Sequence, residues 1–197
     1  NNISKCLIGI DLTAGSSLSN VIGNNITQCR DGIQVGFGAN NNTIIQNSVS
    51  MNWRAGFQIG FLTGESGPEQ GGVENNSFIE NNITDNYIGI YIAYSKNNMI
   101  FHNNVQRNNT TRVHGSYLNF LDDGSKGNFW SDYNGTDANG DGIGDIPYVI
   151  DANNIDNSPL MQMFSPPDTE VLYDYQHVTS LFGAKQQLTS DPAVKWI

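Results

Sequence analysis

The sequence predicts an all-β fold, a right-handed, single-stranded parallel β-helix of about five rungs with an irregular C-terminal cap. Asparagine pairs recur at intervals of 23, 23, 34 and 22 residues, starting at Asn1, Asn24, Asn47, Asn81 and Asn103. Each interval contains short apolar stretches of period two. Charged residues make up 14% of the chain, against about 25% in an ordinary soluble domain. A repeating fold that stacks like residues upon one another accounts for all three observations.

Each repeat contains three short apolar strands. The first strand follows the asparagine pair and the third precedes the next pair. The second follows a glycine in four repeats: Gly9–Leu12, Gly32–Val35, Gly56–Ile59 and Gly89–Ile92. Alternate residues of a strand share a face. One repeat cannot bury that face alone, so the repeats are expected to stack around one continuous core.

Asparagine and glycine mark the corners at which each rung turns. Both residue types tolerate positive φ, and asparagines at one corner are expected to form a hydrogen-bonded ladder. Because neighbouring strands lie about 4.8 Å apart, like charges stacked in such a column would repel each other. A helical solenoid is disfavoured, since no repeat has a helix-length stretch of 3.6-residue periodicity and all are rich in glycine and β-branched residues.

Changes in composition suggest the domain boundaries. Residues 1–127 form the rungs, with an insertion loop at residues 62–73, and residues 128–163 form an aspartate-rich cap. Residues 164–197 lack asparagine and contain paired prolines near their start, so they form a tail or begin another domain. The first rung has no cap, so we expect further rungs upstream or end-to-end self-association through this rung.

The end of the predicted β-helix carries a distinctive sequence. It reads GNFWSDY at residues 127–133, DANGDGIGDIPYVI at 137–150 and DNSPLM at 156–161. This segment is similar to the terminal segment of NosD-like surface proteins, many of them from methanogenic archaea. Residues 1–130 resemble the parallel β-helix repeats of the CASH and NosD-type families, which include carbohydrate-binding proteins, sugar hydrolases and periplasmic copper-binding proteins. The resemblance implies a location at the cell surface, or in the periplasm if the protein is NosD-type, and leaves the activity open.

Eight aspartates lie between residues 122 and 156, and part of this run has the spacing of a calcium loop. The predicted Ca²⁺ ligands are Asp137, Asn139, Asp141, Ile143 and Asp145. Ile143 would bind through its backbone carbonyl and the others through their side chains. The spacing is similar to dockerin and thrombospondin type-3 loops, but Tyr148 replaces the usual bidentate glutamate. Asp132, Asp151 or Asp156 would complete the shell. The alternative is that aspartate, asparagine and glycine simply form turns.

The outer positions of the second strands suggest a carbohydrate-binding face. These positions are Gln34, Gln58 and Tyr91, and they are flanked by Trp53 and Tyr94. Amide ladders suit sugar hydroxyls and aromatic rings suit sugar faces, although the outer face of any solenoid is polar. Glycoside hydrolases need two carboxylates about 5–5.5 or 6.5–9.5 Å apart. The outer positions of the second strands contain one carboxylate, that of Asp11 in the first repeat, so the sequence does not predict catalysis.

Cys6 and Cys29 have the same offset from their asparagine pairs, which predicts that they stack on neighbouring rungs. A Cα separation of about 4.8 Å lies within the disulfide range. The two residues form a buried thiol pair, a disulfide or half of a metal site. Copper favours imidazole and sulfur ligands. The methionines and histidines fall at different offsets, so copper binding is disfavoured.

The net charge of −10 argues against nucleic acid and anionic membranes as partners. No apolar run approaches the roughly 18 residues of a membrane span. The sequence predicts a non-catalytic, extracellular or cell-surface protein with a structural or adhesive role, as in a surface layer or filament. The alternatives are a carbohydrate-binding module or polysaccharide-active enzyme fragment, and a periplasmic copper-handling protein.

Overall fold

The computed structural model describes residues 1–60, 72–114 and 117–165, with the side chains of residues 112–114 excepted. Contacts divide the chain into two units, Asn1–Phe164 and Ser165–Ile197. All the elements described below belong to the first unit. Most of the predicted insertion at residues 62–73 and of the tail at residues 164–197 lies outside the described residues.

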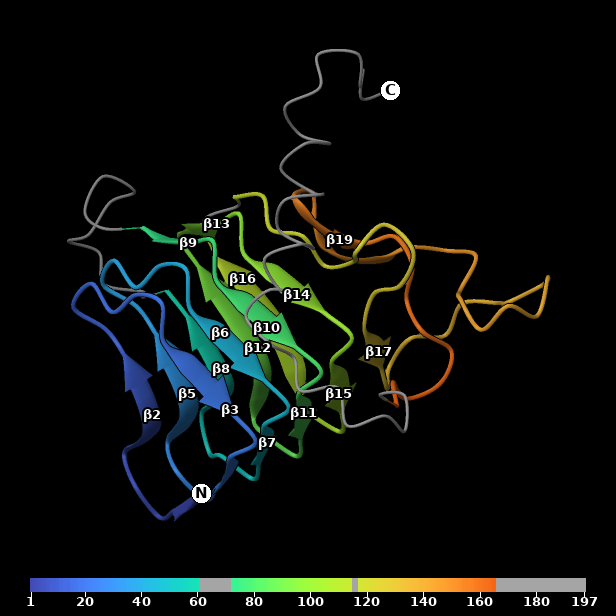
Figure 1. The fold of residues 1–197 in the computed structure, drawn as a ribbon. Helices are drawn as coiled ribbons and strands as arrows, with labels where there is room; N and C mark the ends of the chain where they lie inside the picture. The colour runs from blue at the N-terminus through green and yellow to red at the C-terminus, as the bar shows by residue number, and fades with distance from the viewer. Residues whose placement is uncertain (61–71, 115–116, 166–197) are drawn as a thin grey trace, which may run out of the picture. The chain divides into compact units, whose positions relative to one another are not determined.

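The first unit is a parallel β-solenoid of about five rungs, as predicted (Figure 1). The first sheet contains β1 (Asn2–Ser4), β4 (Asn25–Thr27), β7 (Ser48–Ser50), β11 (Asn82–Thr84), β15 (Asn104–Gln106) and β17 (Phe129–Trp130). The second sheet contains β2 (Ile8–Leu12), β5 (Asp31–Val35), β8 (Ala55–Ile59), β12 (Ile88–Ala93) and β16 (Thr110–His114). The third sheet contains β3 (Asn20–Ile22), β6 (Thr43–Ile45), β10 (Ser77–Ile79) and β14 (Met99–Phe101). A fourth, two-stranded ladder pairs β9 (Val73–Glu74) with β13 (Ser95–Lys96).

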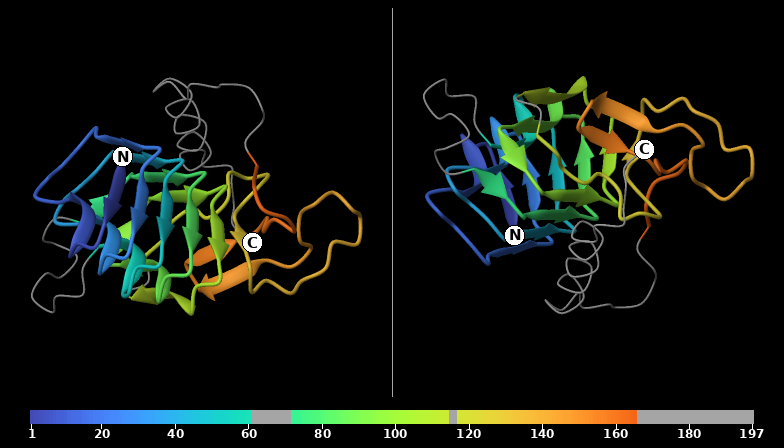
Figure 2. Two further views of the ribbon diagram at one scale, coloured as in Figure 1. Left: turned by 90° about the horizontal axis from the view of Figure 1, so that it is seen from below. Right: turned by 90° about the horizontal axis from the view of Figure 1, so that it is seen from above.

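Equivalent residues of successive rungs pair in register. Ile26 is the partner of Ile3 on one side and of Val49 on the other. The long interval after Asn47 does not disturb this stack, because β7 still pairs directly with β11. Figure 2 shows the strands of each sheet lying side by side along the axis of the solenoid. The long interval therefore leaves the register of the three sheets unchanged.

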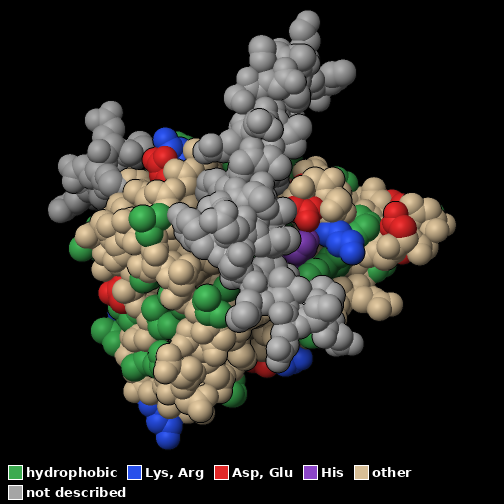
Figure 3. Space-filling model, viewed as in Figure 1, with side chains coloured by type: hydrophobic (Ala, Val, Ile, Leu, Met, Phe, Trp, Pro, Cys, Tyr) green, Lys and Arg blue, Asp and Glu red, His purple; other side chains and the backbone are tan. Residues whose placement is uncertain are grey.

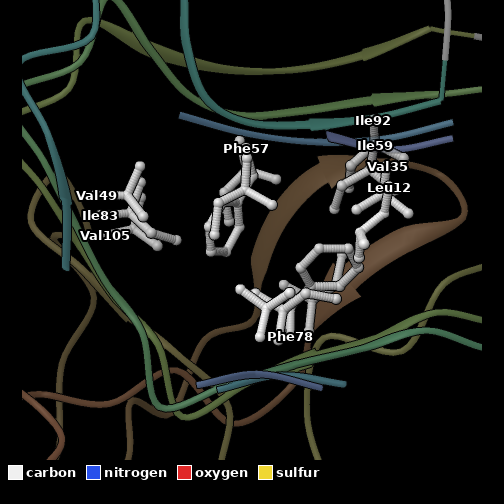
Figure 4. Close-up of a cluster of buried hydrophobic side chains, with 14 of the residues drawn as sticks. Leu12, Val35, Val49, Phe57, Ile59, Phe78, Ile83, Ile92 and Val105 are labelled. Atoms are coloured by element: carbon white, nitrogen blue, oxygen red, sulfur yellow. The ribbon is translucent and has the colours of Figure 1, made fainter. Parts of the chain in front are cut away.

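The inward side chains form one continuous core. Figure 4 shows the columns meeting inside the solenoid, with one column at Val49, Ile83 and Val105 and another at Leu12, Val35, Ile59 and Ile92. Phe57 and Phe78 lie between these columns, with ring centroids 5.4 Å apart. Burial of these apolar surfaces is the main stabilising term, at about 25 cal/mol per Å².

The glycine before each second strand is required by close packing. A Cβ atom on Gly32 would overlap the side chain of Val49 and the carbonyl oxygen of Gly56 in the next rung. None of the glycines at this position has a positive φ. The repeated glycine therefore lets neighbouring rungs approach each other.

The expectation that glycine and asparagine occupy the positive-φ corners is only partly correct. Positive φ occurs at the residue just before most ladder asparagines, the exceptions being the last members Asn119, Asn128 and Asn154. At one corner that residue is Gln46, Glu80 or His102, with φ near 56–57°. A left-handed conformation costs an ordinary residue about 1–2 kcal/mol. The surrounding hydrogen bonds impose this conformation, so the residue type at the position can vary.

The predicted asparagine ladders are present at three corners. In each ladder the side-chain Nδ2 of one asparagine donates to the Oδ1 of the next. The first ladder contains Asn1, Asn24, Asn47, Asn81, Asn103 and Asn128. The second contains Asn42, Asn76, Asn98, Asn119 and Asn154. The third contains Asn52, Asn86 and Asn108. These amides satisfy the buried backbone groups of the turns, which would otherwise cost free energy.

A cap closes the last rung and ends the first ladder. It contains an antiparallel hairpin of β18 (Tyr148–Asp151) and β19 (Asn154–Asp156). The buried carboxylate of Asp156 accepts from the backbone N–H of Asn128 at 2.7 Å and from the indole N–H of Trp130 at 2.8 Å. Trp130 is buried and stacks on Tyr148, with ring centroids 4.5 Å apart. Apolar rings thus cover the core, and a carboxylate accepts the final ladder bonds.

Cys6 and Cys29 form a disulfide between the first two rungs, with Cα atoms 4.5 Å apart. Cys29 stands at the position that Asn52 occupies in the next rung. Its backbone N–H donates to Asn52 Oδ1 at 2.9 Å. The disulfide therefore takes the place of the third ladder at this end of the solenoid.

Replacing both cysteines with alanine is expected to lower the free energy of unfolding by about 3 kcal/mol, because the bond closes a 23-residue loop. Urea unfolding under oxidising conditions measures the change. The control variant, Cys6→Asn/Cys29→Asn, extends the third ladder without a covalent bond and should lie between the wild type and the alanine variant. Equal stability of the alanine variant and the wild type would contradict this account.

Candidate functional site

A groove of about 410 Å³ lies on the surface at the corner between the first and second sheets. We call it the corner groove. It spans three successive rungs and is lined by Met51, Asn52, Trp53, Asp85, Asn86, Tyr87, Arg107 and Asn109. The third ladder forms its base, because Asn52 donates to Asn86 and Asn86 to Asn108. The groove walls therefore rest on a hydrogen-bonded support.

Two aromatic side chains project from equivalent positions of neighbouring rungs in this groove. Trp53 directly follows Asn52, and Tyr87 directly follows Asn86. Trp53 is 65% exposed and Tyr87 is 51% exposed. Within the described residues, neither the Trp53 indole N–H nor the Tyr87 hydroxyl has a hydrogen-bond partner. The groove thus presents two large rings whose polar groups are free to bind a ligand.

An extra residue in the third rung helps to place Trp53. Two residues, Trp53 and Arg54, separate Asn52 from Ala55, whereas one residue fills the equivalent place in the rungs on either side. The backbone N–H groups of Arg54 and Ala55 both donate to the Arg30 carbonyl, so Arg54 forms a local bulge. The Arg54 Nε donates back to Asp31 at 2.6 Å, and the Arg30 Nε donates to Asp31 at 2.8 Å. Asp31 is buried, so these two guanidinium groups neutralise it beside the groove.

An ion pair forms the polar wall of the groove. Arg107 donates through Nη2 and Nε to the two carboxylate oxygens of Asp85, at 2.7 and 2.8 Å. Chiefly through the hydrogen bond from Arg107, the pKa of Asp85 falls from 3.8 to about 2. The carboxylate raises the pKa of the Arg107 guanidinium in turn. Both groups stay charged at neutral pH, and together they carry no net charge.

The structure places most of the predicted carbohydrate face out of contact with solvent. Gln34, Gln58 and Tyr91 stack in register on the second sheet, as predicted. They are buried, however, with exposures of 4%, 3% and 6%. Tyr94 is half-buried and packs against the same outer cluster. Register shows which residues stack but does not show whether they are covered, so Trp53 alone of the five lines the groove.

Three groove residues are not among those predicted from the sequence: Asp85, Tyr87 and Arg107. A signal for Tyr87 was present, because it has the same offset from its ladder asparagine as Trp53. Asp85 and Arg107 likewise share an offset, just before Asn86 and Asn108. An alignment of all rungs by their third-ladder asparagines would have found these residues.

The residues of the predicted calcium loop lie together in an exposed loop of the cap. Asp137 accepts from the backbone N–H groups of Gly140 and Gly142, at 2.7 and 2.9 Å. Asp145 accepts from the backbone of Ala138 at 2.8 Å, and Asn139 donates to Asp141 at 2.9 Å. Ile143 forms an isolated antiparallel bridge with Leu160. The side-chain contacts are those of hydrogen-bonded turns.

The acids predicted to complete the calcium shell have other partners. Asp132 accepts from the Tyr148 hydroxyl at 3.0 Å, and Asp151 accepts from the Asn154 side chain at 2.8 Å. Asp156 is buried at the end of β19. Among the described residues, no group of three or more His, Cys, Asp or Glu side chains is arranged to hold a metal. The structure therefore gives the calcium prediction no support.

The part of the chain that a family model matches is mainly the solenoid. The family model "Periplasmic copper-binding protein (NosD)" matches residues 1–135, which is more than half of the chain. The chain belongs to the NosD family. The NosD match spans the rungs and ends within the first residues of the cap. No curated protein and no solved structure matches the chain significantly.

The described residues of this NosD-family chain do not fit a copper site. Copper favours imidazole and sulfur ligands, but Cys6 and Cys29 are joined in a disulfide. His102 stacks on Phe164 with ring centroids 4.5 Å apart, and its Nε2 lies 3.1 Å from an Asp123 carboxylate oxygen. The two cysteines and His102 are thus engaged in other contacts, and no group of three or more His, Cys, Asp or Glu among the described residues is arranged to hold a metal.

NosD is described as periplasmic. Within the ranges that the structure describes, no helix is long and apolar enough to cross a membrane. On the face shown in Figure 3, uncharged polar groups cover most of the described surface and charged side chains are few.

Proposed function

We propose that this chain is a non-catalytic β-solenoid protein that acts outside the cytoplasm as an adhesive scaffold and holds carbohydrate in the corner groove. The observation that carries this proposal is the pair of exposed rings, Trp53 and Tyr87, on adjacent rungs of a hydrogen-bonded support. Large aromatic side chains are favourable to bury, so two of them exposed in one groove suggest a binding surface.

The chemistry of the groove suits sugars. The face of an aromatic ring carries partial negative charge, and the C–H groups on one face of a sugar ring carry partial positive charge. The free indole N–H and phenol hydroxyl can bond to sugar hydroxyls at the ring edges. Since rungs repeat about every 4.8 Å, a groove across three rungs favours several linked sugars over a single small molecule.

The charged groups in the groove favour binding over cleavage. Hydrolysis of a glycosidic bond requires two carboxylates, whereas Asp85 is the one carboxylate among the residues that line this groove. A lyase needs a base that can give up its proton. Asp85 raises the pKa of Arg107 further, which makes Arg107 unsuitable for that role.

The disulfide and the ladders support the remaining parts of the proposal. Structural disulfides persist in oxidising compartments, which fits the periplasm or the cell surface. Three side-chain ladders along one axis give the rigid frame that a scaffold needs. Self-association through the first rung and a calcium ion in the cap stay predictions, to be tested by native mass and by the effect of EDTA on melting.

Trp53→Ala and Tyr87→Ala are each expected to weaken polysaccharide binding about tenfold, equivalent to about 1.4 kcal/mol, because each removes one stacking ring. Affinity electrophoresis against a panel of neutral and acidic polysaccharides measures the effect. The matched control is Leu7→Ala, an exposed apolar residue at the equivalent position of the first rung and outside the groove. Wild-type protein that binds no member of the panel would refute the proposal.

A further inference from the structure

The ion pair in the corner groove has unused hydrogen-bonding capacity. A guanidinium has five N–H donors. Arg107 uses three of them, two towards Asp85 and one towards Thr84 Oγ1 at 2.8 Å. The two donors on Nη1 have no partner within the described residues. A carboxylate has about four acceptor positions, and side chains occupy three of those on Asp85, which leaves one on Oδ1.

The backbone fixes this pair beside the aromatic rings. Asp85 and Arg107 occupy equivalent corner positions of adjacent rungs, with φ values of 58° and 47°. The backbone N–H of Asp85 donates to the Gln106 carbonyl at 3.1 Å, and that of Arg107 donates to Ser131 Oγ at 2.9 Å. Non-glycine residues at positive φ are strained and persist only where the surroundings hold them. The acceptor and the donors are therefore preorganised before a ligand arrives.

The charge of the pair narrows the class of ligand. An ionised carboxylate and a guanidinium in direct contact cancel each other at long range. The whole chain carries a net charge of −10, which disfavours an anionic polymer. An uronic acid bound on the rings would also bring its carboxylate close to that of Asp85. A neutral ligand that offers a hydroxyl donor and a hydroxyl acceptor side by side matches the remaining positions on the pair.

We propose that the Asp85–Arg107 pair is the specificity-determining element of the corner groove and selects a neutral sugar unit with two adjacent hydroxyl groups. One hydroxyl donates to Asp85 Oδ1, and the neighbouring hydroxyl oxygen accepts from Arg107 Nη1. Trp53 and Tyr87 hold the face of the same chain of sugars. This inference rests on the proposed function, because it requires the groove to bind carbohydrate.

The test compares a neutral polysaccharide that the wild type binds with its uronic acid counterpart. Asp85→Asn and Arg107→Gln should each weaken binding of the neutral polymer about tenfold and reduce the preference for it over the acidic one. Arg107→Lys keeps the charge but loses the paired geometry, so it should also bind weakly. Lys5→Gln is the matched control, since Lys5 occupies the equivalent corner position outside the groove. Wild-type affinity should stay constant from pH 4 to 8.

The outcomes separate this inference from the function on which it rests. Loss of binding in Trp53→Ala, with wild-type affinity in both Asp85→Asn and Arg107→Gln, would overturn the role of the pair and leave carbohydrate binding intact. A wild-type preference for the acidic polymer would also overturn it. Failure of the wild type to bind any polysaccharide would instead remove the proposed function. Melting temperatures close to that of the wild type would establish that the variants are folded.

Discussion

Asn81→Ala is expected to lower the free energy of unfolding by about 3–5 kcal/mol, whereas Asn82→Ala should lower it by less than about 1 kcal/mol. The two residues are adjacent and chemically identical, but they face opposite sides of the solenoid wall. Asn81 is buried and Asn82 is exposed. The comparison therefore isolates the ladder from the properties of asparagine as a residue.

The large effect follows from the number of bonds that Asn81 makes. Its Oδ1 accepts from the backbone and side-chain N–H groups of Asn47, at 2.9 and 3.0 Å. Its Nδ2 donates to the Ile44 and Ile79 carbonyls, and to Asn103 Oδ1. Alanine removes all five bonds, although Asn103 Oδ1 still accepts from the backbone of residue 81 and the Ile79 carbonyl still accepts from the Gln46 backbone. Each unsatisfied buried group costs about 1–3 kcal/mol, and relaxation recovers part of the total.

Urea unfolding of both variants measures the difference, with the slope of the free energy against urea as a check on two-state behaviour. Asn103→Ala, at the next position of the ladder, should behave like Asn81→Ala, because it makes the same set of bonds. Similar losses at positions 81 and 82 would show that the ladder does not stabilise the solenoid.

As the pH rises from 4 to 6, the free energy of unfolding of the wild type is expected to fall by about 3 kcal/mol through Asp156. The Asp156→Asn variant should not show this fall. Burial is the main cause that raises the pKa of Asp156 from 3.8 to about 6. The folded state therefore binds the proton more tightly than the unfolded state. This contribution to stability is complete below pH 3.8 and is lost as the pH rises to about 6.

Asparagine is neutral throughout this range, so the variant loses that dependence on pH. It also resembles the other members of the first ladder in shape and can accept from Asn128 through its oxygen. The amide that replaces Asp156 Oδ1 faces the Ser158 N–H, which is a local cost at every pH. The stability of the variant relative to the wild type should therefore improve steadily from pH 4 to pH 6.

Urea unfolding at several pH values between 4 and 7 measures this change. The control is Asp11→Asn, which removes an exposed acid that accepts from Gln34 near the opposite end of the solenoid. The control should keep the wild-type profile. A profile for Asp156→Asn that parallels the wild type would show that Asp156 does not titrate in this range.

The rungs could be predicted because their physical cause repeats in the sequence. Ile26 stacks between Ile3 and Val49 because all three have the same offset from an asparagine pair. Asp156 could not be placed in this way. It lies 28 residues after Asn128, outside the repeat, and it is of a different residue type. A carboxylate can replace the acceptor half of an amide, but a repeat search does not reveal that substitution.

The site was harder to predict than the fold, because exposure and partners depend on tertiary packing. Gln34 and Trp53 both stand on the outer side of the predicted strands and corners, yet one is buried and the other exposed. The sequence predicts Asp137 as a cation ligand, because the sequence shows the charge of a residue but not its contacts. In the fold, three backbone N–H groups of its own loop bond to its carboxylate.

The direction of the ladders gives the solenoid an electrical polarity. Within each ladder the amide of one asparagine donates to the next member towards the C-terminal rung, so the amide dipoles in one column are aligned. The last amide of the third ladder, Asn108, donates to the Ile83 carbonyl instead. Aligned dipoles reinforce one another and attract negative charge at the C-terminal end, as the N-terminus of a helix does. The first ladder ends on Asp156, and the second ends on Asp151 through Asn154. An artificial β-solenoid built from these rungs would therefore need acidic residues in its C-terminal cap, and a basic cap would oppose the columns beneath it.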